Sequence, residues 1–97
     1  MLMVVLLIGL GWLVVINNGI ILQFGIIKDV PNRSIHNIIL PTTYKTFFVG
    51  VTDMYGYENN GCITRFNYKT LANFEIGDDT MVAVYLQVNK VWLTIGY

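Results

Sequence analysis

One stretch of the chain combines aromatic rings, carboxylates and amides in a pattern that suits sugar binding. Two tyrosines, Tyr55 and Tyr57, lie on either side of Gly56. The polar residues of the same stretch are Asp53, Glu58, Asn59 and Asn60. Aromatic faces stack on sugar rings, and amides and carboxylates bond to hydroxyl groups, so these tyrosines and polar residues are candidate receptor contacts. The alternative is an ordinary long hairpin loop, because tyrosines are common on loop surfaces.

The remaining reactive side chains do not form a catalytic pattern. Asp78 and Asp79 are adjacent in a Gly-Asp-Asp-Thr sequence, which favours a turn, whereas glycoside cleavage needs two carboxylates that converge from separate elements. Cys62 follows a glycine with no indicated base, so it is expected to be a small buried residue. Together with the single histidine, His36, it cannot supply the usual ligands of a zinc site. The sequence therefore predicts no enzymatic activity, no metal and no cofactor.

The composition indicates more apolar surface than one small domain can bury. The 97 residues are 55% hydrophobic and 12% charged, against about 25% charged residues in an average soluble domain. A chain of this length buries only about 60–65% of the surface exposed by its unfolded form. We therefore predict association with further copies of the same chain. The net charge is zero and the basic residues are scattered, so nucleic acid is not an expected partner.

Residues 1–16 carry no charged side chain. This segment offers another explanation for the excess of apolar residues, which is insertion into a membrane. A membrane-spanning helix needs about 20 apolar residues. A signal peptide needs a basic start and a small-residue cleavage site, and neither is present. Membrane insertion is accordingly not favoured, although a small β protein anchored through residues 1–16 is the alternative. We divide the chain into an apolar leader, residues 1–10, and one β domain, residues 11–97.

Elsewhere the hydrophobic pattern has a period of two residues, which is typical of strands. Turn sequences rich in Asn, Asp, Gly and Pro recur about every ten residues, which indicates an antiparallel β-sandwich of about eight short strands with little or no helix. The expected strands cover residues 12–16, 19–28, 35–40, 47–53, 61–68, 71–76, 80–88 and 91–96. The strand at 80–88 is apolar on nearly both faces, so its outer face should be covered by another subunit.

Several short motifs occur in an order that resembles the C-terminal tip domain of bacteriophage tail fibre proteins. They span residues 11–97 and are Gly11-Trp12-Leu13, Asn18-Gly19-Ile20-Ile21-Leu22-Gln23-Phe24-Gly25, Ile39-Leu40-Pro41-Thr42-Thr43-Tyr44, Phe47-Phe48-Val49-Gly50-Val51, Leu71-Ala72-Asn73-Phe74 and Trp92-Leu93-Thr94-Ile95-Gly96-Tyr97. The resemblance implies an all-β, trimeric knob at the distal end of a tail fibre. Such a knob is made in the bacterial cytoplasm, becomes part of the virion and recognises a bacterial surface receptor, either a glycan or an outer-surface protein.

The aromatic residues of these motifs are expected to act in packing rather than in chemistry. Tryptophans in strands are usually core or interface anchors, and Tyr97 resembles the closing residue of the family. The predicted structural and interface residues are Trp12, Phe24, Phe74, Trp92 and Tyr97. An alternative hypothesis of a different functional class is that the chain is a purely structural β module of a larger assembly.

Overall fold

The computed structural model describes residues 3–8, 11–16, 18–31, 33–55, 62–80 and 87–97. These residues contain eight strands and no helix. The strands are β1 (Met3–Ile8), β2 (Gly11–Ile16), β3 (Ile21–Pro31), β4 (Ile35–Ile39), β5 (Phe48–Tyr55), β6 (Cys62–Tyr68), β7 (Asn73–Thr80) and β8 (Gln87–Gly96). In the described part of the chain there is therefore no helix long and apolar enough to cross a membrane.

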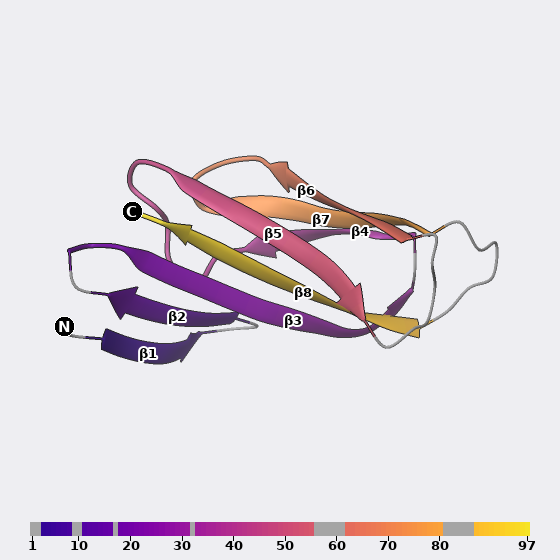
Figure 1. Ribbon diagram of the computed structural model, residues 1–97, viewed down its shortest axis with the longest axis horizontal. Coiled ribbons are helices and arrows are strands. Elements are labelled where there is room, and N and C mark those ends of the chain that lie inside the picture. Colours follow the sequence, from indigo (N-terminus) through magenta and orange to yellow (C-terminus); the bar gives the residue numbers. More distant parts are fainter. Residues whose placement is uncertain (1–2, 9–10, 17, 32, 56–61, 81–86) are drawn as a thin grey trace.

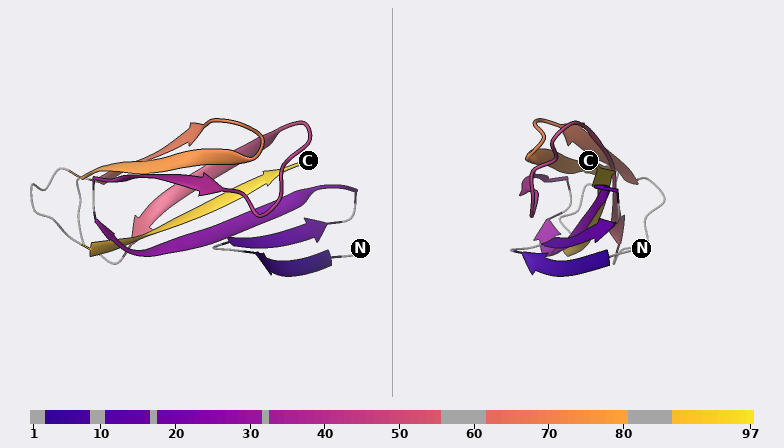
Figure 2. Two further views of the ribbon diagram at one scale, coloured as in Figure 1. Left: turned by 180° about the vertical axis from the view of Figure 1, so that it is seen from behind. Right: turned by 90° about the vertical axis from the view of Figure 1, so that its left-hand side faces the viewer.

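The strands form two antiparallel sheets that pack face to face (Figures 1 and 2). The larger sheet has the order β1-β2-β3-β8-β5, and the smaller sheet has the order β4-β7-β6. The all-β sandwich predicted from the period-two pattern is thus confirmed. The molecule is elongated, with principal dimensions of 46 × 22 × 21 Å.

The hairpin of β1 and β2 lies at the margin of the larger sheet, away from the smaller sheet (Figure 1). Its register pairs Met3 with Ile16 and Ile8 with Gly11, and β2 then pairs with β3. The apolar segments 3–8 and 11–16 are therefore strands and do not form the membrane-spanning helix weighed for this part of the chain. Every residue of β1 and β2 is apolar or glycine.

Two local features fix how β3 enters and leaves the sheet. The predicted turn before it contains Asn18 and Gly19, with φ values of 82° and 79°, and Asn-Gly is the pair best suited to this left-handed backbone. Near its other end, the pairing with β8 shifts between Ile27 and Val30. Asp29 takes a φ of 56° there, and its N–H donates to Asn89 Oδ1 at 3.1 Å. A bulge of this kind bends the strand and increases its local twist.

Two predicted turns are wrong, and both errors fall on charged residues. Gly77, Asp78 and Asp79 lie inside β7, and Asn89 and Lys90 lie inside β8. Asp78 and Lys90 face each other across the sandwich, so that each charge is satisfied and neither strand needs to end. The predicted strand at 80–88 falls largely outside the described residues; its first residue ends β7 and its last two begin β8.

The core between the sheets is built mainly from aromatic rings. Phe66 and Phe74 stack with centroids 4.3 Å apart, and Trp92 meets Phe74 edge-on at 5.3 Å. Phe48 stacks on Tyr44 at 4.9 Å. Phe48 also lies 6.4 Å from Phe66 and from Phe74, so these rings join β5 and β8 of the larger sheet to β6 and β7 of the smaller one. Aromatic pairs of this geometry add about 0.5–1.5 kcal/mol each beyond the burial of their area.

A buried glutamine ties the segment after β4 to the larger sheet. The Gln23 side chain is fully buried; its Nε2 donates to Thr42 O at 3.0 Å, and its Oε1 accepts from Thr42 N at 2.8 Å. The Tyr44 hydroxyl lies 2.8 Å from Thr94 Oγ1 and donates to Ile21 O at 3.2 Å. Buried polar groups are almost always hydrogen-bonded. The two bonds between the Gln23 side chain and the Thr42 backbone therefore hold the segment after β4 in position against β3.

Gly96 is required where β8 passes the start of β5. A Cβ atom built on Gly96 would lie 2.1 Å from the carbonyl oxygen of Phe47 and 2.7 Å from Cα of Phe48. We predict that Gly96→Ala lowers the free energy of unfolding by about 2 kcal/mol, because it overpacks a contact made by backbone atoms. Urea denaturation measures this, and Gly19→Asn, at a turn position with open space around it, should change the stability by a few tenths of a kcal/mol at most.

Candidate functional site

The sequence-predicted receptor residues start at the end of β5. Asp53 is exposed, and its Oδ1 accepts a hydrogen bond from the backbone N–H of the next residue at 2.8 Å. Tyr55 is the last residue of β5. The side chain of Tyr55, together with Tyr57, Glu58, Asn59 and Asn60, lies outside the described residues. Their grouping into one receptor site therefore stays a prediction.

The outer face of the larger sheet is apolar where a solvent-facing sheet would be polar. Alternate residues of β8 point into the core, and the residues between them point outward. Two cross-strand rows run over β3, β8 and β5: Leu22, Ile95 and Val49, then Phe24, Leu93 and Val51. We call these six residues, together with Trp12 and Ile26, the apolar face. Val51 is 62% exposed and Val49 is 46% exposed, although an antiparallel sheet with a wet face normally alternates apolar and polar residues.

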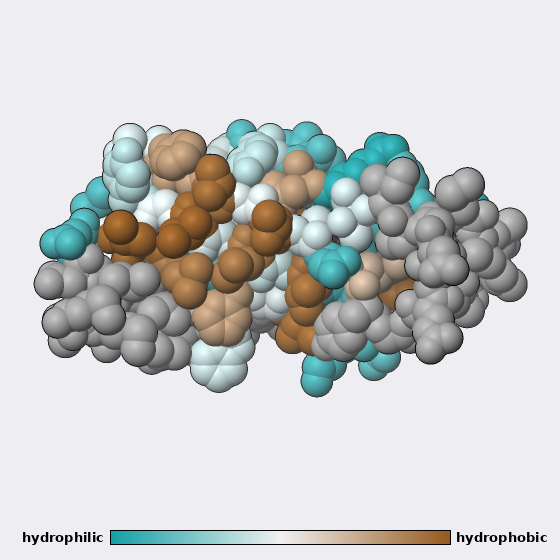
Figure 3. Space-filling model, in the orientation of Figure 1, coloured by the Kyte–Doolittle hydropathy of each residue, from teal (hydrophilic) through white to brown (hydrophobic). Residues whose placement is uncertain are grey.

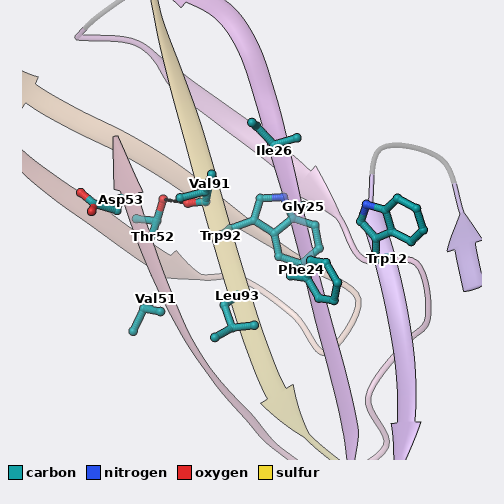
Figure 4. Close-up of a pocket in the computed structure, with 10 residues that line it drawn as sticks. All are labelled: Trp12, Phe24, Gly25, Ile26, Val51, Thr52, Asp53, Val91, Trp92 and Leu93. Atoms are coloured by element: carbon teal, nitrogen blue, oxygen red, sulfur yellow. Dashed lines mark hydrogen bonds between the residues drawn. The ribbon is translucent and has the colours of Figure 1, made fainter. Parts of the chain in front are cut away.

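A hollow of about 640 Å³ lies on this face. Figure 4 shows the side chains around it, with Trp12 and Phe24 on one side and Val51 and Leu93 on the other. The remaining lining residues are Gly25, Ile26, Thr52, Asp53, Val91 and Trp92. The Thr52 hydroxyl donates to Val91 O at 2.7 Å, so its hydrogen atom is bonded to the backbone of β8 rather than offered to a ligand. The hollow is therefore suited to apolar side chains of a partner.

Brown, hydrophobic residues gather across the middle of the face seen in Figure 3. Exposed apolar patches of more than a few hundred Å² are uncommon on monomeric soluble proteins, and they usually mark interaction surfaces. The self-association predicted from composition thus has a defined candidate surface.

The predicted structural aromatics divide between the core and this surface. Phe74 is fully buried and Trp92 is 3% exposed. Trp12 and Phe24 stack on the apolar face with centroids 6.3 Å apart. Tyr97 is half exposed and meets Phe47 edge-on at 6.1 Å. Only the first two are core residues, so the other three are available to an interface.

A buried polar cluster lies between the sheets, where the turn before β4 meets β7 and β8. Lys90 Nζ lies 2.7 Å from Asp78 Oδ1, and both side chains are almost completely buried. Lys90 Nζ also donates to Ser34 O at 2.7 Å and to Ser34 Oγ at 3.1 Å. The Asp78 carboxylate accepts from Arg33 N at 2.9 Å, and Ser34 Oγ lies 2.8 Å from His36 Nε2. The cluster therefore joins the turn before β4 to β7 and β8.

The comparisons with known proteins found no matching family model and no similar curated sequence. Solved structures do match. The N-truncated R2-type pyocin tail fibre aligns over 100% of this chain and 38% of its own length, with a TM-score of 0.77 and 20% identity. A second R2 pyocin fibre structure from P. aeruginosa gives the same TM-score over 26% of its length, and the P. aeruginosa R1 pyocin fibre gives 0.72 at 13% identity over 28%.

The chain shares the fold of a part of these pyocin tail fibres. The resemblance to phage tail-fibre tips indicated by the sequence motifs is thus confirmed at the level of the fold. The chain spans between a quarter and two fifths of the fibre chains that it matches.

The motifs that indicated this tail-fibre fold are explained by their structural positions. Asn18 and Gly19 make the turn into β3, and Gln23 holds Thr42. Gly96 allows β8 to pass close to the start of β5. The resemblance therefore rests on residues that position the strands, which is why it predicts the fold better than it predicts a binding site.

Sequence reasoning missed the cluster of Lys90 and Asp78 in the tail-fibre fold. One signal was present: Lys90 is in phase with Val88 and Trp92, and Asp78 is in phase with Phe74 and Ile76. On each of these two strands, every second residue points into the core, and one of those inward positions carries a charge. Two opposite charges at inward positions indicate a buried ion pair. Among the described residues, no group of three or more His, Cys, Asp or Glu side chains is placed to hold a metal ion.

His36 is expected to make the stability of the fold depend on pH. Partial burial, and next the positive charge of Lys90, lower the pKa of His36 below 6.5, while Asp78 acts in the opposite direction. The folded state thus binds a proton less readily than the unfolded state. We predict that stability is constant above about pH 6.5 and falls as the pH decreases from there through the lower folded-state pKa.

Urea midpoints measured from pH 8 to pH 5 test this dependence. His36→Gln keeps a polar group near Ser34 but cannot titrate, so it should flatten the part of the slope between the two pKa values of His36. An equal slope in the wild type and His36→Gln would contradict the assignment.

Proposed function

We propose that this chain is the tip of a tail fibre, of a phage, a prophage or a phage tail-like particle, and that it binds a glycan receptor on a bacterial surface. The observation that carries the proposal is the match of the whole chain to pyocin tail fibres at a TM-score of 0.77. The candidate receptor residues support the proposal because they combine tyrosines with amides and carboxylates. Tyrosine rings stack on sugar rings, and amides and carboxylates bond to sugar hydroxyl groups.

The second part of the proposal is that the apolar face and the hairpin of β1 and β2 join copies of the chain into a trimer. Three copies around one axis give a closed arrangement in which every apolar face is used. The apolar face supports this role because none of its eight residues is charged. In such a fibre the chain would be a component of the virion tail at its distal end.

Adsorption to host cells tests the receptor part of the proposal. We predict that Tyr55→Ala combined with Tyr57→Ala reduces cell adsorption at least tenfold without changing the oligomeric state, because each tyrosine contributes about 1 kcal/mol of stacking. Ile39→Ala, at an exposed apolar position of β4, is the matched control and should adsorb like the wild type. Unchanged adsorption of the double variant would instead favour the purely structural β module.

A further inference from the structure

A second hollow of about 340 Å³ lies where the start of β5 meets the turn between β6 and β7. It is lined by Thr46, Phe47, Phe48, Tyr68, Lys69, Thr70 and Leu71, and we call it the aromatic groove. Unlike the apolar face, it combines rings with hydroxyl groups and a charged side chain. It is also separated from the predicted receptor residues by the length of β5.

The wall formed by Tyr68 is a flat ring held in place. Its hydroxyl accepts a hydrogen bond from Gly50 N at 2.9 Å, and the ring packs on Phe66 at 4.8 Å and on Phe48 at 5.3 Å. Yet Tyr68 is 53% exposed. A ring that is both exposed and fixed loses little conformational entropy when a ligand stacks on it.

The other apolar walls are also fixed by the backbone. Phe47 is half exposed, and its N–H and carbonyl group both bond to Tyr97, at 3.1 and 3.0 Å. Leu71 lies in a turn that is held by Thr70 Oγ1, which accepts from the N–H groups of Ala72 and Asn73. The groove is thus formed before any ligand binds.

The polar rim of the groove is formed by Lys69 and by the hydroxyl groups of Thr46 and Thr70. Lys69 Nζ pairs with Glu75 Oε1 at 3.0 Å, and both side chains remain partly exposed. An ammonium group donates and a threonine hydroxyl group can both donate and accept, so Lys69 and Thr46 can bond to adjacent hydroxyl groups of one ligand. Because the two charges compensate each other, the rim does not favour a charged ligand.

We propose that the aromatic groove binds a neutral sugar ring, with its C–H face on Tyr68 and its hydroxyl groups directed to Lys69 and Thr46. Sugar rings combine an apolar face with a polar edge, and the groove presents the same two surfaces side by side. The inference rests on the proposed function, since it gives the receptor-binding tip a second contact with a glycan.

Saturation-transfer NMR on the full chain tests the groove with the methyl glycosides of glucose, galactose and N-acetylglucosamine, and with methyl glucuronide as the charged comparison. At least one neutral glycoside should receive saturation and shift the ring signals of Tyr68. Tyr68→Leu should weaken this binding about tenfold, Tyr68→Phe should retain it, and Ile39→Ala should leave it unchanged.

The proposal is overturned if none of the neutral glycosides shifts the Tyr68 signals, if Tyr68→Leu binds as tightly as the wild type, or if the glucuronide binds better than all neutral sugars. Unchanged folding of the variants is verified by circular dichroism, and a loss of binding shared by Tyr68→Leu and Tyr68→Phe would assign the effect to the bond with Gly50 and also overturn the stacking role. Wild-type chain that fails to adsorb to any host cell contradicts the proposed function instead, whatever the glycosides do.

Discussion

Replacing Asp78 by alanine is expected to lower the free energy of unfolding by about 3–5 kcal/mol, because it leaves a buried positive charge without its partner. Lys90 is 2% exposed and lies 2.7 Å from Asp78 Oδ1. The same substitution removes the acceptor for the backbone N–H of Arg33. Denaturation in urea, followed by circular dichroism, measures the loss.

The neighbouring aspartate supplies a matched control. Asp79 pairs with Arg65, and these two side chains are 52% and 59% exposed. Exposed ion pairs contribute about 0–1 kcal/mol, so Asp79→Ala should have a small effect. Asp78→Ala combined with Lys90→Met should recover much of the stability, since replacing both buried charges removes the unpaired one. Similar losses for Asp78→Ala and Asp79→Ala would contradict the burial of the ion pair.

The sandwich was predictable because its strands repeat a simple physical pattern. In β8, every second residue from Val88 to Gly96 is buried, and this alternation is visible in the sequence. The turn at Asn18 and Gly19 was equally visible, since few other pairs accept its backbone. Strand limits were less predictable where a polar residue is paired across the core, as Asp78 and Lys90 are, because the partner lies on a distant part of the chain.

The sequence predicted that the chain has binding surfaces, but not which residues form them. The composition indicated an excess of apolar area, but the apolar face appears only when the register places Leu93 beside Phe24 and Val51. The aromatic groove was not predicted, because Phe47 and Tyr68 are 21 positions apart in the sequence: Phe47 directly precedes β5 of the larger sheet, and Tyr68 ends β6 of the smaller one. Binding surfaces made by several strands depend on pairing, and hydrophobic periodicity alone does not specify pairing.

Introducing charges on the apolar face is expected to abolish self-association while the fold is retained. Val51 and Leu93 are direct cross-strand partners and are 62% and 40% exposed. Val51→Lys combined with Leu93→Glu places opposite charges side by side, which is favourable in a sheet and keeps the net charge at zero. In an apolar interface the same two charges lose their hydration, at a cost of at least about 3 kcal/mol, so the dissociation constant should rise by about a hundredfold or more.

Sedimentation equilibrium over a range of protein concentrations measures this change, and circular dichroism verifies the fold. Ile35→Lys combined with Ile39→Glu is the matched control, because these residues are 69% and 76% exposed on β4 of the smaller sheet and the net charge is again unchanged. This control should assemble like the wild type. If both double variants assemble normally, the apolar face is not the interface; if both dissociate, assembly depends on the smaller sheet as well. Dissociation of the first alone would place the contact between copies on β5 and β8, beside the aromatic groove.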